Sequence, residues 1–198
     1  MSKTLGFIHY IMFDKIRFQD SITDLLIKFA EDNNIEIIRQ KVDSQGEIEE
    51  GKLEDIIDDK NIHQWIQKRV IIVEKRFMKS VETIMDKDID LKKDILKLIY
   101  EKGLKDGEEI EKDITPKEIY GYISSKFLDG MPCDRAIAIE EEKEDSLIYT
   151  VEEDLHTIYW PENIKNIYWD IRDEYIKGLL CNLKYSQYRL MDYRYEIR

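Results

Sequence analysis

Apolar side chains recur every three or four residues along the first 32 positions of the chain. Such a spacing places them on one face of a helix. We therefore expect a long helix over residues 4–32. Its apolar stripe comprises Phe7, Ile11, Phe18, Ile22, Leu25 and Phe29.

The pattern is less regular in the segment that follows this helix. Residues Ile35 to Val42 fit either a strand or a second helix. The acidic stretch from Asp43 to Asp59 is typical of a loop, with a short helix around Leu53 to Ile57. The sequence leaves the element boundaries within residues 33–60 open.

A second long helix is predicted from Asn61 onward. Asp58, Asp59 and Asn61 are residue types that cap helix N-termini, because their side-chain oxygens accept hydrogen bonds from the first free backbone N–H groups. Helical spacing then continues for more than six turns. The apolar positions are Ile62, Ile66, Val70, Val73, Phe77, Val81 and Ile84.

Two shorter helices are expected next. Leu91, Ile95, Leu98 and Ile99 mark the first, which should end near Gly103, since glycine tolerates the left-handed conformation at a helix C-terminus. The second begins at Thr115-Pro116-Lys117-Glu118. This run combines a threonine cap, a proline at the first helical position and a glutamate that bonds back to the cap. Gly130 closes this second helix.

The period of the pattern changes after Gly130. Ala136–Glu140 and Leu147–Val151 are rich in strand-forming residues and are joined by a short charged connection, which predicts a hairpin. His156–Trp160 is interpreted as a third strand before Pro161. Alternation at Tyr193, Tyr195 and Ile197 predicts a closing strand. A long helix lies between, with apolar positions Ile164, Ile167, Tyr168, Ile171, Tyr175 and Leu179.

This order of elements predicts the fold class. N-terminal helices are followed by a small antiparallel sheet, a long helix and a closing strand, which is an α+β arrangement that is mainly α. The chain has 198 residues, with no repeat and no linker that would divide it. We therefore expect a single domain over residues 1–198.

Charge and cysteine content narrow the classes of protein. Acidic residues number 43 against 31 basic ones, for a net charge of −12. The resulting field repels nucleic acid and anionic membranes, so neither is an expected partner. Two cysteines form no disulfide framework, and neither a secretion signal nor a membrane-spanning run is recognised, which favours a reducing cytoplasm.

Familiar catalytic signatures are absent, which leaves a few residues of interesting type. His9, in an apolar run, is either a core histidine with a neighbouring hydrogen-bond partner or a functional residue. Asp14 either points inward with the apolar stripe or is exposed. Cys133, in a loop, is a candidate nucleophile. Cys181 is read as a small core residue.

The remaining histidines give no metal site. Glu153 and His156 form a single Glu-x-x-His pair, whereas two-metal sites in helical bundles use two such motifs. A chance match is the preferred reading, although His156 stays a candidate acid or base. His63 is interpreted as a partly exposed helix residue. No metal is therefore predicted, and no cofactor is assigned.

Tyrosine and tryptophan are concentrated after residue 158. These side chains combine a large apolar area with a polar tip, and they line ligand pockets and interfaces as well as protein cores. Tyr159, Trp160, Trp169 and Tyr188 are the ligand or partner candidates. An exposed aromatic helix face would also permit a homodimer. The cluster comprises Tyr159, Trp160, Tyr168, Trp169, Tyr175, Tyr185, Tyr188, Tyr193 and Tyr195.

The same part of the chain carries a family resemblance. It contains Ile158-Tyr-Trp-Pro-Glu, Tyr168-Trp-Asp-Ile-Arg-Asp-Glu-Tyr-Ile-Lys-Gly178 and Arg189-Leu-Met-Asp-Tyr-Arg-Tyr-Glu-Ile-Arg198. This region resembles the end of the L-2-amino-thiazoline-4-carboxylate hydrolase-like family, and it is similar to vinyl-reductase-type ligand-binding domains. Both resemblances imply a small-molecule pocket. The cysteine that such families carry before the final strand is replaced by Met191, so no catalytic residue is carried over.

Three functional hypotheses follow. The first is a regulatory or sensor-like module that binds a small molecule or a protein partner against an aromatic-lined pocket or face. The second is a small hydrolase-like enzyme with His9, Asp14, Cys133 or His156 near that pocket. The third treats the acidic runs Glu47–Asp59 and Glu140–Asp154 as a surface that binds a basic partner or imitates nucleic acid.

Overall fold

The computed structural model describes residues 5–58, 60–130 and 134–198. Within this range the chain forms two compact units. Unit 1 contains the described residues up to Ile89 together with Ser125–Leu128, and unit 2 contains Asp90–Ser124 and the described residues from Asp129 to Arg198. The expectation of a single domain stays a prediction.

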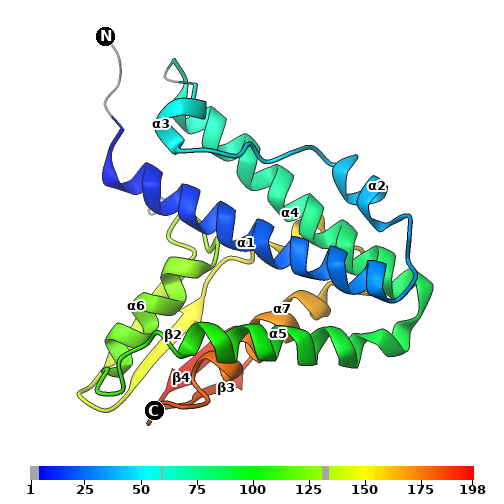
Figure 1. Ribbon diagram of the computed structural model, residues 1–198. Coiled ribbons are helices and arrows are strands. Elements are labelled where there is room, and N and C mark those ends of the chain that lie inside the picture. Colours follow the sequence, from blue (N-terminus) through cyan, green and yellow to red (C-terminus); the bar gives the residue numbers. More distant parts are fainter. Residues whose placement is uncertain (1–4, 59, 131–133) are drawn as a thin grey trace. The chain divides into compact units, whose positions relative to one another are not determined.

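Unit 1 is helical. The four helices are α1 (Phe7–Asp32), α2 (Ile38–Asp43), α3 (Leu53–Ile56) and α4 (Ile62–Lys87). The two long helices, α1 and α4, pack along each other (Figure 1). Asn61 caps α4, with its side chain accepting a hydrogen bond from the backbone N–H of Gln64. Both predicted long helices and the short helix near Leu53 are confirmed, and the ambiguous segment after Ile35 is resolved as helix.

The buried face of α1 differs from the predicted stripe. Phe7 is 80% exposed, and Ile11 and Phe18 are only half-buried. The face that packs is displaced from that stripe to neighbouring positions of the helix, because α4 and α2 contact α1 at those positions. Its buried members are Met12, Phe13, Ile16, Gln19, Ile22, Thr23, Leu26, Ile27 and Ala30.

A buried arginine joins three segments of unit 1. Nε of Arg76, on α4, lies 3.0 Å from Oδ1 of Asp20 on α1. Its Nη1 donates to Oδ1 of Asp43 at 3.0 Å and to the carbonyl oxygen of Gly46 at 2.9 Å. The planar guanidinium has five donors, so one side chain can bond to all three segments. Charged groups as well as apolar contacts therefore fix α2 and its following loop against the long helices.

Unit 2 contains the α+β part of the chain. Its helices are α5 (Lys92–Gly107), α6 (Pro116–Lys126) and α7 (Asn166–Leu179), and its strands are β1 (Ile137–Glu142), β2 (Leu147–Val151), β3 (Gln187–Met191) and β4 (Arg194–Ile197). The predicted capping box is present at α6, where the backbone N–H of Thr115 donates to Glu118 and the backbone N–H of Glu118 donates to the Thr115 hydroxyl. The predicted fold class, α+β and mainly α, is confirmed.

The four strands form one antiparallel sheet in the order β1-β2-β4-β3. Its buried face carries Tyr149 and Tyr195, which are stacked with ring centroids 5.2 Å apart. Tyr120 of α6 packs against Tyr149 from the helical side, at 5.0 Å. The closing strand is confirmed as β4, but it is half of a hairpin. Its partner β3 was not predicted.

The helices α5 and α7 approach each other through glycine. A Cβ atom on Gly103 would lie 2.1 Å from the carbonyl oxygen of Tyr175, and one on Gly178 would lie 2.1 Å from that of Tyr100. Gly107 lies equally close to the backbone of Leu179. The prediction that a helix ends near Gly103 is therefore wrong. Gly103 lies inside α5, where the missing side chain allows two backbones to touch.

The segment His156–Trp160 is not a strand as predicted. Residues Thr157–Tyr159 form a single 3-10 turn. Oδ1 of Asp154 accepts hydrogen bonds from the backbone N–H groups of His156 and Thr157, at 3.0 and 2.9 Å, and such local side-chain bonds favour a turn over a ladder. Among the described residues, none of the helices carries an apolar stretch long enough to cross a lipid bilayer.

Candidate functional site

A buried charged cluster lies in unit 2, between the segment that follows α6 and α7. Arg172 of α7 donates two hydrogen bonds to Asp129, at 2.5 Å to Oδ1 and 2.9 Å to Oδ2. Nε2 of His156 lies 3.3 Å from Oδ1 of the same carboxylate, and its ring stacks on Tyr168. The side chains of Asp129, His156 and Arg172 are 8%, 2% and 2% exposed. We call these three residues the buried cluster.

The buried cluster contains an ion pair in which Asp129 stays ionised. Burial by itself would raise the pKa of Asp129, but the Arg172 charge and the hydrogen bonds from His156 and Arg172 together outweigh it. The pKa of Asp129 is held well below its ordinary value. Since two of its members are almost fully covered, the cluster has no open face for a substrate, and its direct role is to hold the chain in place.

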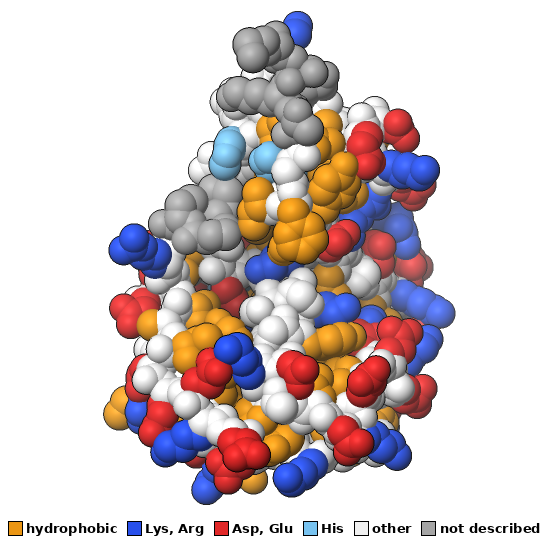
Figure 2. Space-filling model, turned by 90° about the vertical axis from the view of Figure 1, so that its left-hand side faces the viewer, with side chains coloured by type: hydrophobic (Ala, Val, Ile, Leu, Met, Phe, Trp, Pro, Cys, Tyr) orange, Lys and Arg blue, Asp and Glu red, His pale blue; other side chains and the backbone are white. Residues whose placement is uncertain are grey.

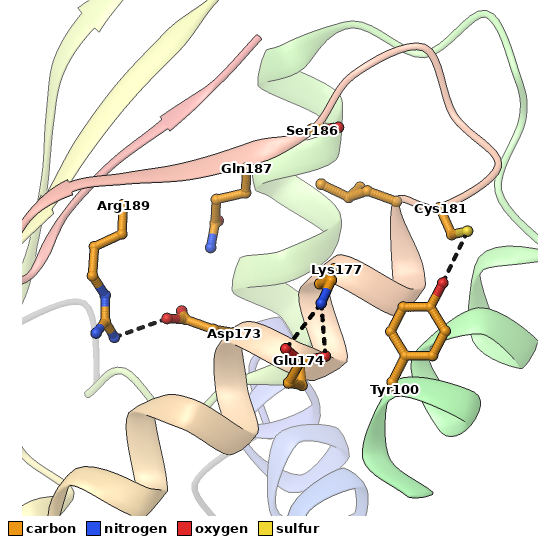
Figure 3. Close-up of a pocket in the computed structure, with 9 residues that line it drawn as sticks. Tyr100, Asp173, Glu174, Lys177, Cys181, Ser186, Gln187 and Arg189 are labelled. Carbon is orange, nitrogen blue, oxygen red and sulfur yellow. Dashed lines mark hydrogen bonds and ion pairs between the residues drawn. The ribbon is translucent and has the colours of Figure 1, made fainter. Parts of the chain in front are cut away.

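A pocket of about 360 Å³ opens in the same unit, between α5, α7 and β3 (Figure 3). Most of its lining is polar or charged, which distinguishes it from an aromatic-lined pocket. Both helices and the segment that enters the sheet contribute side chains. The lining residues are Tyr100, Asp173, Glu174, Lys177, Leu180, Cys181, Ser186, Gln187 and Arg189.

Asp173 is the most unusual group in this pocket. Nη2 of Arg189 lies 2.9 Å from Oδ2 of Asp173, so one oxygen of the carboxylate is paired. The other oxygen, Oδ1, is buried and has no hydrogen-bond partner among the described residues. Burial raises the pKa of Asp173 to about 6, although the nearby Arg189 and Arg172 charges oppose the shift. The carboxylate is therefore mostly ionised at pH 7 and has an acceptor to offer.

Two further pairs complete the lining. Nζ of Lys177 bonds to both carboxylate oxygens of Glu174, at 3.1 and 3.3 Å. At the rim, the Tyr100 hydroxyl donates to Sγ of Cys181 at 3.1 Å, and this bond raises the pKa of Tyr100. The cations and anions of the lining are matched two to two, so the pocket has no strong preference for either sign of charge.

The candidate acids and bases from the sequence lie elsewhere. Nδ1 of half-buried His9 accepts a hydrogen bond from the backbone N–H of Gly6 at 2.9 Å, and Asp14 is exposed on α1. His63 is exposed, with its ring centroid 5.9 Å from that of His9. These residues belong to unit 1. Cys133 lies outside the described residues.

Glu153 and His156 do not share a metal-binding arrangement. Glu153 is exposed, whereas His156 is buried against Asp129. Within the part of the chain that the structure describes, no group of three or more histidine, cysteine, aspartate or glutamate side chains is arranged to hold a metal ion. Cys181, read as a core residue, is exposed.

The aromatic candidates do not line the pocket. Trp160 and Trp169 are buried, and Nε1 of Trp169 donates to Asp154 at 3.3 Å. Tyr159 is half-buried next to them in sequence. Tyr188 is 45% exposed on the outer face of the sheet, beneath the Arg198 guanidinium. The structure thus brings the two tryptophans into the core of unit 2 and leaves Tyr188 at the surface.

Several residues of the acidic runs have cationic partners. Glu49 pairs with Arg69, and Glu142 with Lys117 at 2.9 Å. Glu140 pairs with Arg194 at 2.8 Å. Asp59 lies outside the described residues. On the face shown in Figure 2, acidic and basic side chains are interspersed.

Sequence reasoning missed the pocket and the buried cluster. A signal for the cluster was present, because Arg172 follows Tyr168 by four positions and precedes Tyr175 by three, and so falls on the apolar stripe of α7. A charge on such a stripe needs a buried partner. The partner, Asp129, is too distant in sequence to be found by spacing. Nothing marked Asp173 or Arg189, since charged residues on a helix and on an edge strand are ordinary.

Comparison of the chain with models of protein families, with curated proteins and with solved structures gives no match. The function must therefore be argued from the pocket itself.

Proposed function

We propose that unit 2 is a binding module for a small polar molecule, which occupies the pocket between α5, α7 and β3. The observation that carries this proposal is the Asp173 carboxylate. This carboxylate lies in the lining of the pocket and its side chain is about a third exposed, while its Oδ2 atom is paired with Arg189. An ionised carboxylate has about four acceptor positions, so a ligand in the pocket can donate a hydrogen bond to it while this ion pair persists.

The charge balance of the pocket supports a ligand without strong net charge. Arg189 is matched by Asp173, and Lys177 is matched by Glu174. A ligand with a large net charge would leave one of these pairs facing a like charge. A neutral or zwitterionic molecule avoids this, which favours metabolite-like ligands over polyanions.

The test uses a variant that fills the pocket and a matched variant that does not. Gln187→Trp places a large side chain in the lining, whereas Tyr188→Trp, one residue along β3, enlarges a side chain on the outer face of the sheet. The parent and both variants are purified and analysed by native mass spectrometry for a co-purified molecule, and by ligand-detected NMR against a library of small polar fragments.

We expect bound molecules or fragment hits for the parent and for Tyr188→Trp, and their loss in Gln187→Trp. Hits that are retained in Gln187→Trp, or a parent protein with neither a bound molecule nor a hit, would contradict the proposal. Far-UV circular dichroism of both variants shows that the comparison is made between folded proteins.

The hydrolase-like alternative and the family resemblance stay predictions. His9 and Asp14 lie in unit 1, and His156 is bound to Asp129 inside unit 2. The thiol of Cys181 lies at the pocket, and its hydrogen-bond partner is a tyrosine hydroxyl rather than a base. The pocket therefore supports binding better than nucleophilic catalysis.

A further inference from the structure

The pocket lining is hydrogen-bonded to a buried tyrosine of the sheet. The hydroxyl of Tyr149, on β2, belongs to one of the fully buried side chains of unit 2. The same hydroxyl lies 2.7 Å from Oε1 of Gln187, a residue of the pocket lining. Both residues belong to unit 2.

The direction of this bond follows from the groups involved. The Tyr149 hydroxyl donates its proton to the carbonyl oxygen of the Gln187 amide. Burial raises the pKa of Tyr149 well above its ordinary value, and the hydroxyl therefore keeps its proton at every physiological pH.

This direction fixes the orientation of the Gln187 amide. Because its carbonyl oxygen accepts from Tyr149, its NH₂ group is turned to the opposite side. Figure 3 shows the amide nitrogen of Gln187 directed toward the space beside Asp173. The pocket therefore presents two complementary groups, a donor at Gln187 and an acceptor at the Asp173 carboxylate.

We propose that the ligand of this pocket carries a hydrogen-bond acceptor and a donor side by side, as in a primary carboxamide, and that Tyr149 acts as a positioning residue for this recognition. The inference rests on the proposed binding function. A carboxamide gives its carbonyl oxygen to Gln187 and its N–H to Asp173. A carboxylate lacks the donor, and an amidinium lacks the acceptor, so each leaves one of the two groups without a partner.

Three probes of similar size and shape separate these cases: benzamide, benzoate and benzamidine. Each is titrated against ¹⁵N-labelled protein, with chemical shifts of the Gln187 side-chain amide as the reporter. We expect benzamide to bind at least about tenfold more tightly than the other two, which is the worth of one hydrogen bond of ordinary strength. Its binding should also perturb the Gln187 resonances.

Tyr149→Phe tests the positioning role. It keeps the buried ring and removes the hydroxyl that orients the amide. Gln187 can then rotate, and the preference for benzamide should fall to within about threefold, on the order of what a freely rotating amide retains. The matched control is Tyr188→Phe, which removes a hydroxyl on the outer face of the same sheet and should leave the preference unchanged.

Gln187→Glu gives a second test that does not disturb the core. It replaces the donor by an acceptor, so the pocket then presents two acceptors and should prefer benzamidine. Either an unchanged preference in Tyr149→Phe or a retained benzamide preference in Gln187→Glu would overturn the inference. Tight binding of benzoate or benzamidine to the parent would overturn it too, while leaving the binding function intact. Failure of all three probes to bind the parent would overturn the inference, whereas the binding function itself is decided by the native mass spectrometry and the fragment screen described above.

Discussion

In unit 1 the principal helices pack through large apolar side chains, whereas in unit 2 they pack through glycine. Phe13 of α1 meets Trp65 of α4 with ring centroids 6.2 Å apart, and residues such as Ile16 and Val73 are fully buried. Between α5 and α7, by contrast, Gly103 and Gly178 bring backbones into direct contact. Side-chain packing can adjust when one residue changes, but two touching backbones have no side chain that can move aside.

The two units also differ in the solvent exposure of the carboxylates that pair with their buried arginine. The partners of Arg76 reach water, with Asp20 16% and Asp43 45% exposed. The partner of Arg172 is 8% exposed. A charge that keeps contact with water loses little when its partner is removed, whereas an enclosed charge loses most of its stabilisation. Unit 2 should therefore tolerate substitution less well than unit 1.

The largest effect is expected for Arg172→Met. It leaves the buried Asp129 carboxylate without its counter-ion, and we expect the free energy of unfolding to fall by about 3–5 kcal/mol. Urea denaturation followed by circular dichroism measures the change. Arg194→Met is the matched control, because the Arg194 and Glu140 side chains are both about a third exposed, and it should change the free energy of unfolding far less than Arg172→Met. Equal effects for the two variants would contradict the enclosure argument.

The second largest loss of stability is expected for Gly103→Ala. The new methyl group would meet the Tyr175 carbonyl oxygen, and α5 and α7 must separate to admit it, at a cost of about 3 kcal/mol. Gly121→Ala on α6 is its control, since nothing lies within 4 Å of that position. Because alanine is the better helix former, this variant should gain up to about 1 kcal/mol. Thermal denaturation of both variants gives the difference, and two similar melting temperatures would refute the close approach.

Arg76→Met tests the same comparison from the side of unit 1. Its two carboxylate partners remain partly hydrated after the change, so we expect a loss of only about 1–2 kcal/mol. The measurement is the same urea titration that is used for Arg172→Met. A loss as large as that of Arg172→Met would mean that exposure of the partners does not set the difference between the two units.

The smallest predicted effect concerns pH. The pKa of Asp173 is about 6 in the folded protein against an ordinary value of 3.8, so between these values the folded state holds a proton that the unfolded state has lost. Stability should therefore fall as pH rises from about 4 to about 7. Since the side chain is about a third exposed, we expect a loss of about 1 kcal/mol.

Asp173→Asn should remove this part of the pH dependence. Stability of the parent and the variant is measured by urea denaturation at several pH values across the window. Asp192→Asn, a change at an exposed position, is the control and should keep the slope of the parent. A parent whose stability rises between pH 4 and pH 7 relative to Asp173→Asn would contradict the assigned direction.

The comparison also shows which features a sequence pattern can predict. The long helices α1 and α4 are predictable from their apolar spacing, α4 also from its asparagine cap, and α6 from a complete capping box. A glycine in a helical pattern, however, can indicate either the end of the helix or a close approach of another backbone. Gly130 has a positive φ of 83° but lies beyond the end of α6 at Lys126 rather than at the helix end as predicted, and Gly103 lies inside α5. Only the partner helix distinguishes the two, and spacing along one chain does not reveal a partner.

The missed strand β3 has a similar cause. Its turn into β4 contains Asp192 and Tyr193, and Tyr193 adopts a positive φ of 62° that is usual for glycine or asparagine. Without such a residue the turn carried no signal. The pocket was missed because it depends on this strand. Its groups come from α5, α7 and β3, and their proximity is a product of the tertiary fold rather than of any local motif.

The distance along the chain between α5 and α7 has a consequence for the synthesis of unit 2. The glycine face of α5 emerges from the ribosome well before α7, its partner, because α6 and the first hairpin are made in between. The α5 helix is therefore synthesised before its packing partner is available, whereas α1 and α4 of unit 1 can already pack against each other. Closing such a distant contact is slow compared with local helix pairing. We expect the amide protons of α1 and α4 to become protected from exchange first during refolding, and those of α5 and α7 to follow together.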